Sequence, residues 1–357
     1  MAYRVIQWAT GAMGKACLRA VIDHPGLDLV GLYVYSSAKD GKDAGEIARR
    51  EPTGVIATRS IEEILALKAD VVIHAPRLNP PYTYHNEEIC RLLASGKNVI
   101  SINGHSYPHY WGAGYARRFE GACRQGVSTL FGTGLNPGFI AEKIAVAASG
   151  LCLDIDRIEI TEMIRCHQIQ NPKYAFDILG FGTPCESIDP NDPSWVPAAV
   201  LNGLYSEVVA FLAARLGMAL EQVETDHVML PATRDIETAA GLIRKGTTSH
   251  TNWRWHGIVG GRRRVSLSIF WIMETSHLEQ SAFPLWEVRI EGLPGVKIAI
   301  DLEKPEDYPF KAEAAQLALA ASVVNSVPAV CAAAPGILLV PAFAPFCPRK
   351  QDSSGIE

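Results

Sequence analysis

The sequence lacks the features expected of a membrane or nucleic-acid-binding protein. The formal net charge is −5 at pH 7, and the basic run that stands out is "GGRRRV" at residues 260–265, which we interpret as a solvated turn between strands. The longest apolar segment, "VPAVCAAAPGILLVPAFAPF", is interrupted by four prolines, so we expect no transmembrane segment. We therefore expect no nucleic-acid partner and no membrane partner.

The sequence also lacks the cysteine patterns of metal sites and disulfide frameworks. None of its eight cysteines forms a CxxC pair or a zinc-like spacing, so we expect no metal and interpret the cysteines as buried thiols in a reducing compartment. The first residues lead directly into a strand pattern, without a charged segment followed by an apolar one. We therefore expect no signal peptide and a cytoplasmic protein.

The first half of the chain alternates between strand and helix patterns. Short Val/Ile-rich runs such as "YRVIQWA", "ADVVIHAP" and "KNVISI" are separated by helical stretches such as "MGKACLRAVIDH" and "YHNEEICRLLASG". Ser60 followed by Glu63 marks a further helix start, at "SIEEILAL". This order predicts a doubly wound parallel sheet, an α/β Rossmann domain at residues 1–150.

The second half has a different pattern. "DRIEITEMIR", "RRRVSLSIFWIME" and "PLWEVRIEG" alternate polar and apolar residues, which is typical of antiparallel strands that are solvated on one face. Two helices are expected, in "LNGLYSEVVAFLAARLG" and "KAEAAQLALAASVVNSV". We predict an α+β substrate and dimerisation domain with an open mixed or antiparallel sheet at residues 151–310, and about 311–357 completing the Rossmann domain.

Small residues follow the first predicted strand at the spacing of a dinucleotide-binding turn. Ala9 stands where the pattern G-x-G-x-x-G has its first glycine, and Gly11 and Gly14 occupy the other two places. Gly11 would let a pyrophosphate approach the helix N-terminus, and Gly14 would let the helix pack closely on the strand. The motif is weak alone, but here it lies between a strand and a helix. The expected contacts at this turn are Ala9, Thr10, Gly11, Ala12, Met13 and Gly14.

The tip of the second strand bears on the choice of cofactor. NAD-binding sites usually carry an acidic residue there, to bind the ribose hydroxyls. This chain has Ser36 and Ser37, followed by Lys39. Hydroxyls and a cation suit a 2′-phosphate, so we expect NADP(H) to be favoured over NAD(H); the alternative is a solvated turn. We also expect Ala75 and Pro76, which end the strand "ADVVIHAP", to contact the cofactor.

The chain resembles the dihydrodipicolinate-reductase-like NAD(P)-dependent oxidoreductases, in particular the branch of 2,4-diaminopentanoate dehydrogenases and native amine dehydrogenases. The likeness rests on "WATGAMGK", "SSAKDGKDAGE", "GTGLNPGF" and "VVNSVPAVCAAAPG". It implies a homodimer, a last helix (about 315–327) that returns to the Rossmann side, and an active site between the domains. It also implies that Asn136, Pro137 and Gly138 lie beside the nicotinamide and that Asn325 contributes to the cofactor site. For Asn136, capping of the following helix is the alternative.

One departure from that family concerns the proton-transfer group. In amine-forming relatives the segment after "NVIS" carries a glutamate, whereas this chain has Asn103, Gly104 and His105 there. His105 can donate a proton near neutral pH, and Tyr107 can donate a hydrogen bond to a developing alkoxide. We therefore consider Asn103, His105 and Tyr107 as candidate catalytic residues. A solvated or backbone-bonded histidine is the alternative.

Aromatic residues are frequent in the second half of the chain. Tyr174, Phe176, Trp253 and Trp255 are candidates for an apolar substrate pocket. Alternation along a strand puts Trp253 and Trp255 on one face, which is either a pocket wall or plain core. No Arg/Lys cluster accompanies them, so a di- or tricarboxylate substrate is not expected.

Three functions remain open at this point. The first is hydride transfer from NAD(P)H to a C=O or C=N carbon of a small, largely apolar substrate. The second is an amine dehydrogenase with a relocated acid, for which Glu142 and Glu162 are candidates. The third is a dinucleotide-binding regulatory protein without turnover, because the expected glutamate is missing.

Overall fold

A computed structural model of the chain describes residues 2–278, 283–308 and 312–347. The chain divides into two compact units. Unit 1 comprises Met1–Phe139, Ala199–Glu207 and Leu302–Val340, and unit 2 comprises Ile140–Ala198, Val208–Asp301 and Pro341–Glu357. Unit 1 therefore includes nine residues from the middle of the sequence, Ala199–Glu207, which the division expected from sequence did not include.

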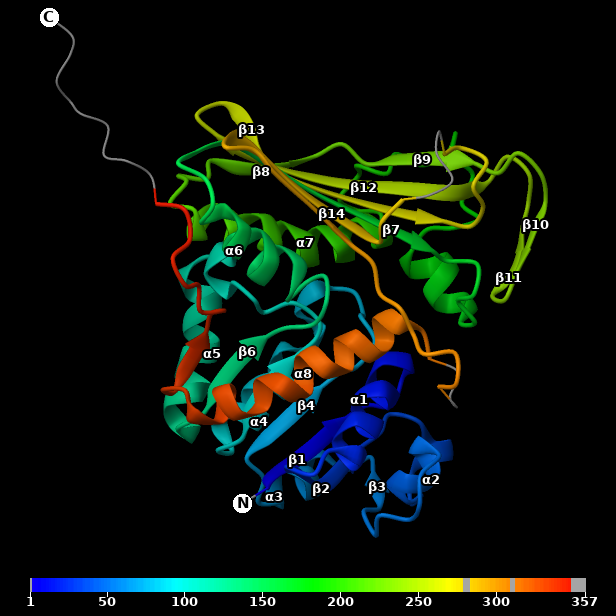
Figure 1. Cartoon of the computed structure of the whole chain (residues 1–357). Coiled ribbons are helices and arrows are strands. Elements are labelled where there is room, and N and C mark those ends of the chain that lie inside the picture. Colours follow the sequence, from blue (N-terminus) through cyan, green and yellow to red (C-terminus); the bar gives the residue numbers. More distant parts are fainter. Residues whose placement is uncertain (1, 279–282, 309–311, 348–357) are drawn as a thin grey trace, which may run out of the picture. The chain divides into compact units, whose positions relative to one another are not determined.

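Unit 1 is built on a parallel sheet with seven strands in the order β16-β6-β5-β4-β1-β2-β3 (Figure 1). Every strand pair in it is parallel. The strands are β1 (Tyr3–Trp8), β2 (Leu27–Tyr33), β3 (Ala57–Thr58), β4 (Val71–His74), β5 (Asn98–Ser101), β6 (Thr129–Gly132) and β16 (Gly336–Leu338). The predicted Rossmann architecture is confirmed.

Helices connect and cover these strands. They are α1 (Ala12–Asp23), α2 (Ala44–Ala48), α3 (Ile61–Ala66), α4 (Asn86–Ala94), α5 (Ala113–Gly126) and α8 (Ala314–Ala332), with short 3₁₀ helices at Ser37–Lys39, Tyr82–His85 and Pro108–Trp111. The predicted cap of α3 is present, because the backbone N–H of Glu63 donates to the Ser60 hydroxyl at 3.2 Å. The last helix, α8, packs against α1 within unit 1 (Figure 1).

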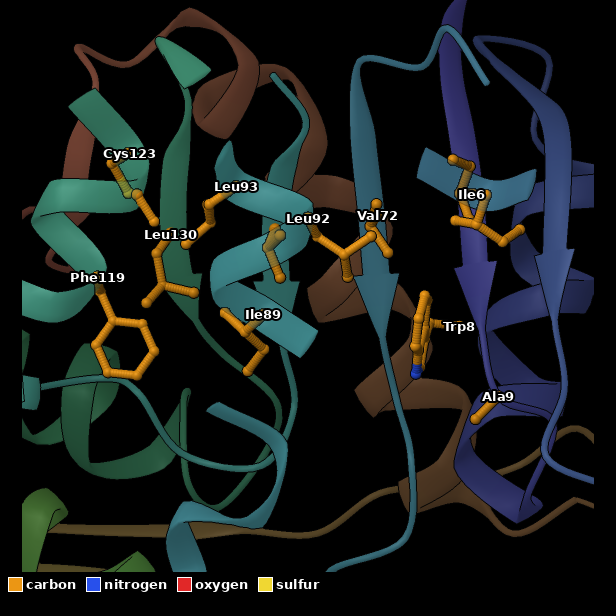
Figure 2. Close-up of a cluster of buried hydrophobic side chains, with 13 residues drawn as sticks. Ile6, Trp8, Ala9, Val72, Ile89, Leu92, Leu93, Phe119, Cys123 and Leu130 are labelled. Carbon is orange, nitrogen blue, oxygen red and sulfur yellow. The ribbon is translucent and has the colours of Figure 1, made fainter. Parts of the chain in front are cut away.

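The core of unit 1 lies between the sheet and its helices. Figure 2 shows Ile89, Leu92 and Leu93 of α4 between Leu130 of β6 and Val72 of β4. These five side chains are fully buried. Their burial fixes α4 on the face of the sheet and holds the 3₁₀ helix before it at the carboxyl end of β4, which is the edge where ligands bind in open parallel sheets.

Unit 2 is built on a mixed sheet. Its order is β15-β14-β7-β13-β12-β8, and β9 also pairs with β12. The strands are β7 (Asp154–Arg165), β8 (Gln222–Thr225), β9 (Val228–Pro231), β12 (Thr248–Val259), β13 (Arg262–Ile272), β14 (Trp286–Leu293) and β15 (Val296–Ile300), with a separate pair β10 (Ile236–Thr238) and β11 (Gly241–Ile243). The sheet is mixed, which is one of the two predicted arrangements: β7 and β13 pair in parallel, although the alternation of their residues is typical of antiparallel strands. The basic run at 260–265 was expected to be a solvated turn. Gly260 and Gly261 do form the turn between β12 and β13, but the three arginines begin β13, which pairs with the end of β12.

Unit 2 also holds short helical segments at Ile140–Ala145, Val146–Ser149 (α6) and Lys173–Ile178. The long helix α7 (Val196–Arg215) is divided between the two units. By length and composition α7 and α8 could each cross a membrane, but 83% of the apolar window of α7 is buried in the protein. For α7 this is the expected burial of a core helix. No disulfide joins the eight cysteines, and four of them are buried.

Candidate functional site

The turn after β1 has the geometry of a dinucleotide-binding turn. Ala9 adopts a left-handed conformation with φ 71°, the conformation for which the pattern uses glycine. The side-chain amide of Gln7 donates to the Ala9 carbonyl oxygen at 2.9 Å. A Cβ on Gly14 would collide with that same oxygen, whereas a Cβ on Gly11 would meet no described atom within 4 Å. Gly14 therefore serves close packing of α1 on β1, and Gly11 leaves an open approach to the helix.

The start of α1 suits an anion. Gly11 is the N-cap residue and no side chain caps the helix within the described chain, so its first N–H groups remain directed at the space above the turn. Ala12 and Met13, the first residues of α1, are exposed. The ammonium group of Lys39 donates to the backbone oxygen and the hydroxyl of Thr10, at 2.9 and 2.8 Å.

Positive charge gathers around this turn. Burial, followed by the charge of Lys15, lowers the pKa of Lys39, and burial with the charges of Arg19 and Arg49 lowers the pKa of Lys15. Cations that destabilise one another favour a bound anion, because it relieves their repulsion. Ser36 and Ser37, next to Lys39 in sequence, are exposed. The residues present thus fit a dinucleotide cofactor.

A carboxylate that the sequence did not indicate lies near the tip of β2. Glu88 of α4 accepts a hydrogen bond from the Tyr35 hydroxyl at 2.9 Å, and Tyr35 follows β2 by two residues. Glu88 also contacts the ring nitrogens of His74 and His85, at 2.8 and 2.6 Å. Burial would raise the pKa of Glu88, but the hydrogen bonds from the two histidines lower it to about 2.

His74, His85 and Glu88 could hold a metal ion by residue type and proximity. Two observations favour a hydrogen-bonded cluster instead. One carboxylate oxygen lies within 2.6–2.8 Å of both histidine nitrogens, closer than two ligands of one zinc ion would lie. The second nitrogen of His74, Nδ1, is buried without a described partner, whereas ligating histidines almost always donate their other N–H to an acceptor.

The segments after β4 and β5 meet next to the glycine turn. The backbone N–H of Ala75 donates to Trp8 at 3.0 Å, and the Ala75 oxygen lies 3.4 Å from the position of a Cβ on Gly14. The side-chain amide of Asn103 donates to the Pro76 oxygen at 2.8 Å. The structure therefore brings Ala75, Pro76 and Asn103 together with the turn at Ala9, as expected of one ligand-binding edge.

His105 occupies a different environment from the one expected of a proton donor. It is 2% exposed, and its ring nitrogens lie 3.1 Å from the Ser101 hydroxyl and 3.1 Å from the Asn86 side-chain oxygen. Burial, followed by the charges of His74 and His85, lowers its pKa to about 3. Such an imidazole is neutral at pH 7 and already hydrogen-bonded. This geometry favours the structural alternative for His105, that it fixes the loop after β5.

The segment "LNPGF" follows β6. A Cβ on Gly138 would collide with the backbone of Thr133 and Gly134, so the segment folds back on the end of the strand. The Thr133 hydroxyl donates to the Gly138 oxygen at 3.3 Å, and the Tyr205 hydroxyl donates to the backbone oxygen of Asn136 at 3.4 Å. The next helix begins at Ile140, two residues after Gly138. Asn325 is an exposed residue of α8.

A buried carboxylate of α7, Glu207, was missed from the sequence. It is 0% exposed. Its Oε1 accepts from the backbone N–H of Tyr107 at 2.5 Å, and its Oε2 accepts from the Tyr82 hydroxyl at 2.7 Å and the Trp111 indole at 3.2 Å. Burial raises the pKa of Glu207 to about 7, against the opposing effect of these hydrogen bonds. The available signal was a single acidic residue inside the apolar run "LYSEVVAFLAA".

The aromatic candidates of unit 2 fall into two groups. Trp253 and Trp255 are 1% and 0% exposed, and both indoles contact His227, at ring distances of 4.8 and 5.0 Å. They share one face of β12, as expected, and their burial favours the core alternative over a pocket wall. Tyr174 and Phe176 are half-buried. Burial, with the nearby Cys166 and Glu162, raises the pKa of Tyr174 to about 12.

The acids considered for a relocated role, Glu142 and Glu162, are both buried residues of unit 2, 1% and 4% exposed. Each of these two side chains interacts with residues around it. Glu207, by contrast, contacts the loop after β5 itself, which is the segment from which the glutamate is missing.

Comparison with known proteins agrees with this architecture. Residues 5–101 match the family model described as dihydrodipicolinate reductase, N-terminus. An amine dehydrogenase of Streptomyces virginiae is 26% identical over 314 residues, covering 83% of this chain and 84% of that protein. The structure of an amine dehydrogenase from Mycobacterium smegmatis superimposes with a TM-score of 0.74 at 19% identity, covering 95% of both chains. That of GenD2 from gentamicin A biosynthesis, in complex with NAD, gives a TM-score of 0.50 at 16% identity, covering 92% of this chain and 86% of that one.

Proposed function

We propose that this chain, a dihydrodipicolinate-reductase-like NAD(P)-dependent oxidoreductase, transfers hydride between NADP(H) and the carbon of a C=O or C=N bond in a small, largely apolar substrate. The observation that carries the proposal is the turn after β1: Gly14 packs against the Ala9 carbonyl, and the position of a Cβ on Gly11 lies in open space. The bound nicotinamide would supply the hydride chemistry.

The residues of unit 1 have separable tasks in this proposal. The first N–H groups of α1 bind the pyrophosphate. Lys39, with Ser36 and Ser37 beside it, binds the 2′-phosphate and so favours NADP(H) over NAD(H). The segment Asn136–Gly138 and the side chain of Asn103 orient the nicotinamide at the carboxyl ends of β5 and β6. Tyr107, on the loop after β5, hydrogen-bonds the oxygen or nitrogen of the substrate.

Reductive amination is the second candidate. It is supported by the similarity to amine dehydrogenases in both sequence and fold. In that reaction the acceptor is a cationic imine formed from a carbonyl compound and ammonia. The missing glutamate after β5 weighed against it, and the carboxylate of Glu207 of α7, which contacts the same loop, weighs in its favour.

One assay separates these functions. NADPH oxidation is followed at 340 nm with a panel of aliphatic and aromatic ketones and aldehydes, each with and without ammonium. Turnover without ammonium supports carbonyl reduction, and turnover that requires ammonium supports reductive amination. Binding of NADPH without turnover on any member of the panel would contradict the proposal and support a regulatory dinucleotide-binding protein.

Two further expectations belong to the proposal. We propose that the chain acts as a homodimer, as its resemblance to the family implies, and that it acts in the cytoplasm, as its scattered cysteines indicate. Light scattering after size-exclusion chromatography measures the assembly state, and a mass near 38.8 kDa, that of one chain, would contradict it.

A further inference from the structure

The side chains around Glu207 form a node that joins three segments of unit 1. Tyr82 belongs to the 3₁₀ helix after β4, Tyr107 and Trp111 belong to the loop after β5, and Glu207 belongs to α7. Tyr82 is held tightly in this node, because a Cβ on Gly104 would collide with its hydroxyl and a Cβ on Gly203 would lie 2.5 Å from its Cβ. Its ring also stacks on His105, at 6.1 Å between ring centres.

The charge of Glu207 has no cationic counterpart in this node. Its described partners are hydrogen-bond donors without a positive charge: a phenol, a backbone amide and an indole. The titratable groups that face it are Tyr82, Tyr115 of α5, and, behind Tyr82, the neutral imidazole of His105. Burying a carboxylate without a cation costs free energy. The segments that Glu207 holds in place explain why a carboxylate is present here.

We infer that Glu207 is a positioning residue of the active site: its ionised carboxylate fixes the loop after β5 against Tyr82, and protonation releases that loop. This inference rests on the proposed function, because it assigns the loop to substrate binding. The hydrogen-bond pattern gives the reason. The Tyr107 N–H and the Trp111 indole N–H can only donate, so a protonated carboxyl group can give its hydrogen only to the Tyr82 oxygen, and Tyr82 must then turn its own hydrogen away.

The direction of the pH dependence follows from this pattern. Burial raises the pKa of Glu207 to about 7, so the carboxylate is ionised and the loop fixed above that pH. Below it the group is protonated and the loop is released. Loop order and turnover should both fall as the pH decreases through about 7, while NADPH affinity should hardly change, because the loop contacts substrate and the glycine turn binds the pyrophosphate.

Glu207→Gln tests the inference, because the amide carries no charge and cannot accept three hydrogen bonds. The variant should behave at every pH as the wild type does at low pH. We expect kcat/KM at pH 8 to fall about 10–100-fold, the effect of losing charge-assisted hydrogen bonds, with the NADPH dissociation constant changed less than about twofold. Glu87→Gln makes the same change at an exposed position of α4. It is the matched control and should keep the wild-type pH profile.

A second readout requires neither substrate nor cofactor. The Trp111 indole donates to Glu207, so tryptophan fluorescence of the wild type should show a titration near pH 7 that is absent from Trp111→Phe and from Glu207→Gln. Hydrogen exchange at pH 8 should be faster in peptides spanning 103–111 of Glu207→Gln and unchanged in peptides spanning 3–14. Unchanged exchange in the loop, or a fluorescence titration that persists in Glu207→Gln, would overturn the inference.

Tyr82→Phe keeps the inference testable if Glu207→Gln does not fold. This variant removes one donor that lowers the pKa of Glu207, so the titration should move upward by about one pH unit. A titration that stays in place or moves downward would contradict the assignment to Glu207. If the wild type oxidises NADPH with none of the ketones and aldehydes of the panel, the proposed function is refuted. The fluorescence and exchange measurements would still decide the role of Glu207.

Discussion

The glycine turn after β1 and the loop after β5 lie at the same edge of one sheet but are specified in different ways. The turn is local, because the contacts that shape it join Gln7, Ala9 and Gly14, which lie within a few positions of one another. The loop is held from a distance, because Glu207 lies 100 residues after Tyr107. A local arrangement can be inferred from spacing, whereas a distant one needs the fold.

The largest effect is expected for the glycine turn after β1. Gly14→Ala places a methyl group against the Ala9 carbonyl oxygen and 2.9 Å from its carbon, and backbone atoms cannot move aside cheaply. We expect the free energy of unfolding to fall by about 3 kcal/mol, the upper end for overpacking, with cofactor binding lost as well. Urea denaturation measures the change. Wild-type stability in this variant would mean that α1 does not pack on β1 as described.

A comparable effect is expected for the loop after β5. A Cβ on Gly132, at the end of β6, would collide with the backbone of Gly104, His105 and Ser106. Gly132→Ala should therefore displace the loop after β5, lowering stability by about 1–3 kcal/mol and impairing turnover more than NADPH binding. Urea denaturation and steady-state kinetics separate the two effects. Equal losses of kcat/KM and of NADPH affinity would contradict the separate tasks of loop and turn.

Lys39 tests the cofactor preference. Lys39→Ala removes the ammonium group that lies on Thr10, and we expect about a 10–100-fold loss of NADPH affinity, the equivalent of a hydrogen bond to a charged group. NADH affinity should fall less, because NADH lacks the 2′-phosphate. Isothermal titration with both cofactors measures this. Lys42→Ala is the control, since Lys42 is exposed and paired with Glu46 at 2.7 Å. Wild-type protein that binds NADH more tightly than NADPH would contradict the preference.

The smallest effect on activity is expected for His105. His105→Ala leaves Ser101 and Asn86 without their buried partner, which should cost about 1–3 kcal/mol of stability. A direct proton donor would instead show a 10²–10⁴-fold loss of turnover, the usual range for a general acid, at unchanged stability. The two outcomes are distinguished by measuring kcat and unfolding together, with Tyr107→Phe as the comparison for a donor role of that hydroxyl.

His105 also contributes to acid sensitivity. Its pKa is about 3 in the folded chain and near 6.5 in an unfolded one. The unfolded state therefore binds more protons between these values, so the stability due to the neutral imidazole is present above about pH 6.5 and is lost as the pH falls toward 3. Replacing His105 should reduce the slope of unfolding free energy against pH in that window by up to about 1.4 kcal/mol per pH unit. An unchanged slope would mean that His105 titrates normally.

The sequence predicted those parts of the fold that depend on residues close together in the chain. Val/Ile-rich runs between helical segments predicted the parallel sheet, and Ser60 predicted the start of α3. Contacts across long sequence distances could not be inferred in this way. The parallel pairing of β7 with β13 depends on a connection that the alternation pattern does not encode. The neutral state of His105 depends on its burial and on the nearby His74 and His85. Glu207 stood out in the sequence as a single acidic residue in an apolar run, but its partners Tyr82, Tyr107 and Trp111 could not be inferred.

Titration of NADPH into Gly11→Ala tests whether the turn after β1 binds the cofactor. A Cβ at this position meets no described atom within 4 Å, so the variant should unfold at the wild-type denaturant concentration, within about 0.5 kcal/mol. Gly121→Ala is the matched control, because its Cβ is equally unhindered and lies on α5. If the turn after β1 binds the pyrophosphate, Gly11→Ala loses NADPH binding at least about tenfold while Gly121→Ala retains it. Wild-type NADPH affinity in Gly11→Ala would contradict the assignment of the cofactor site.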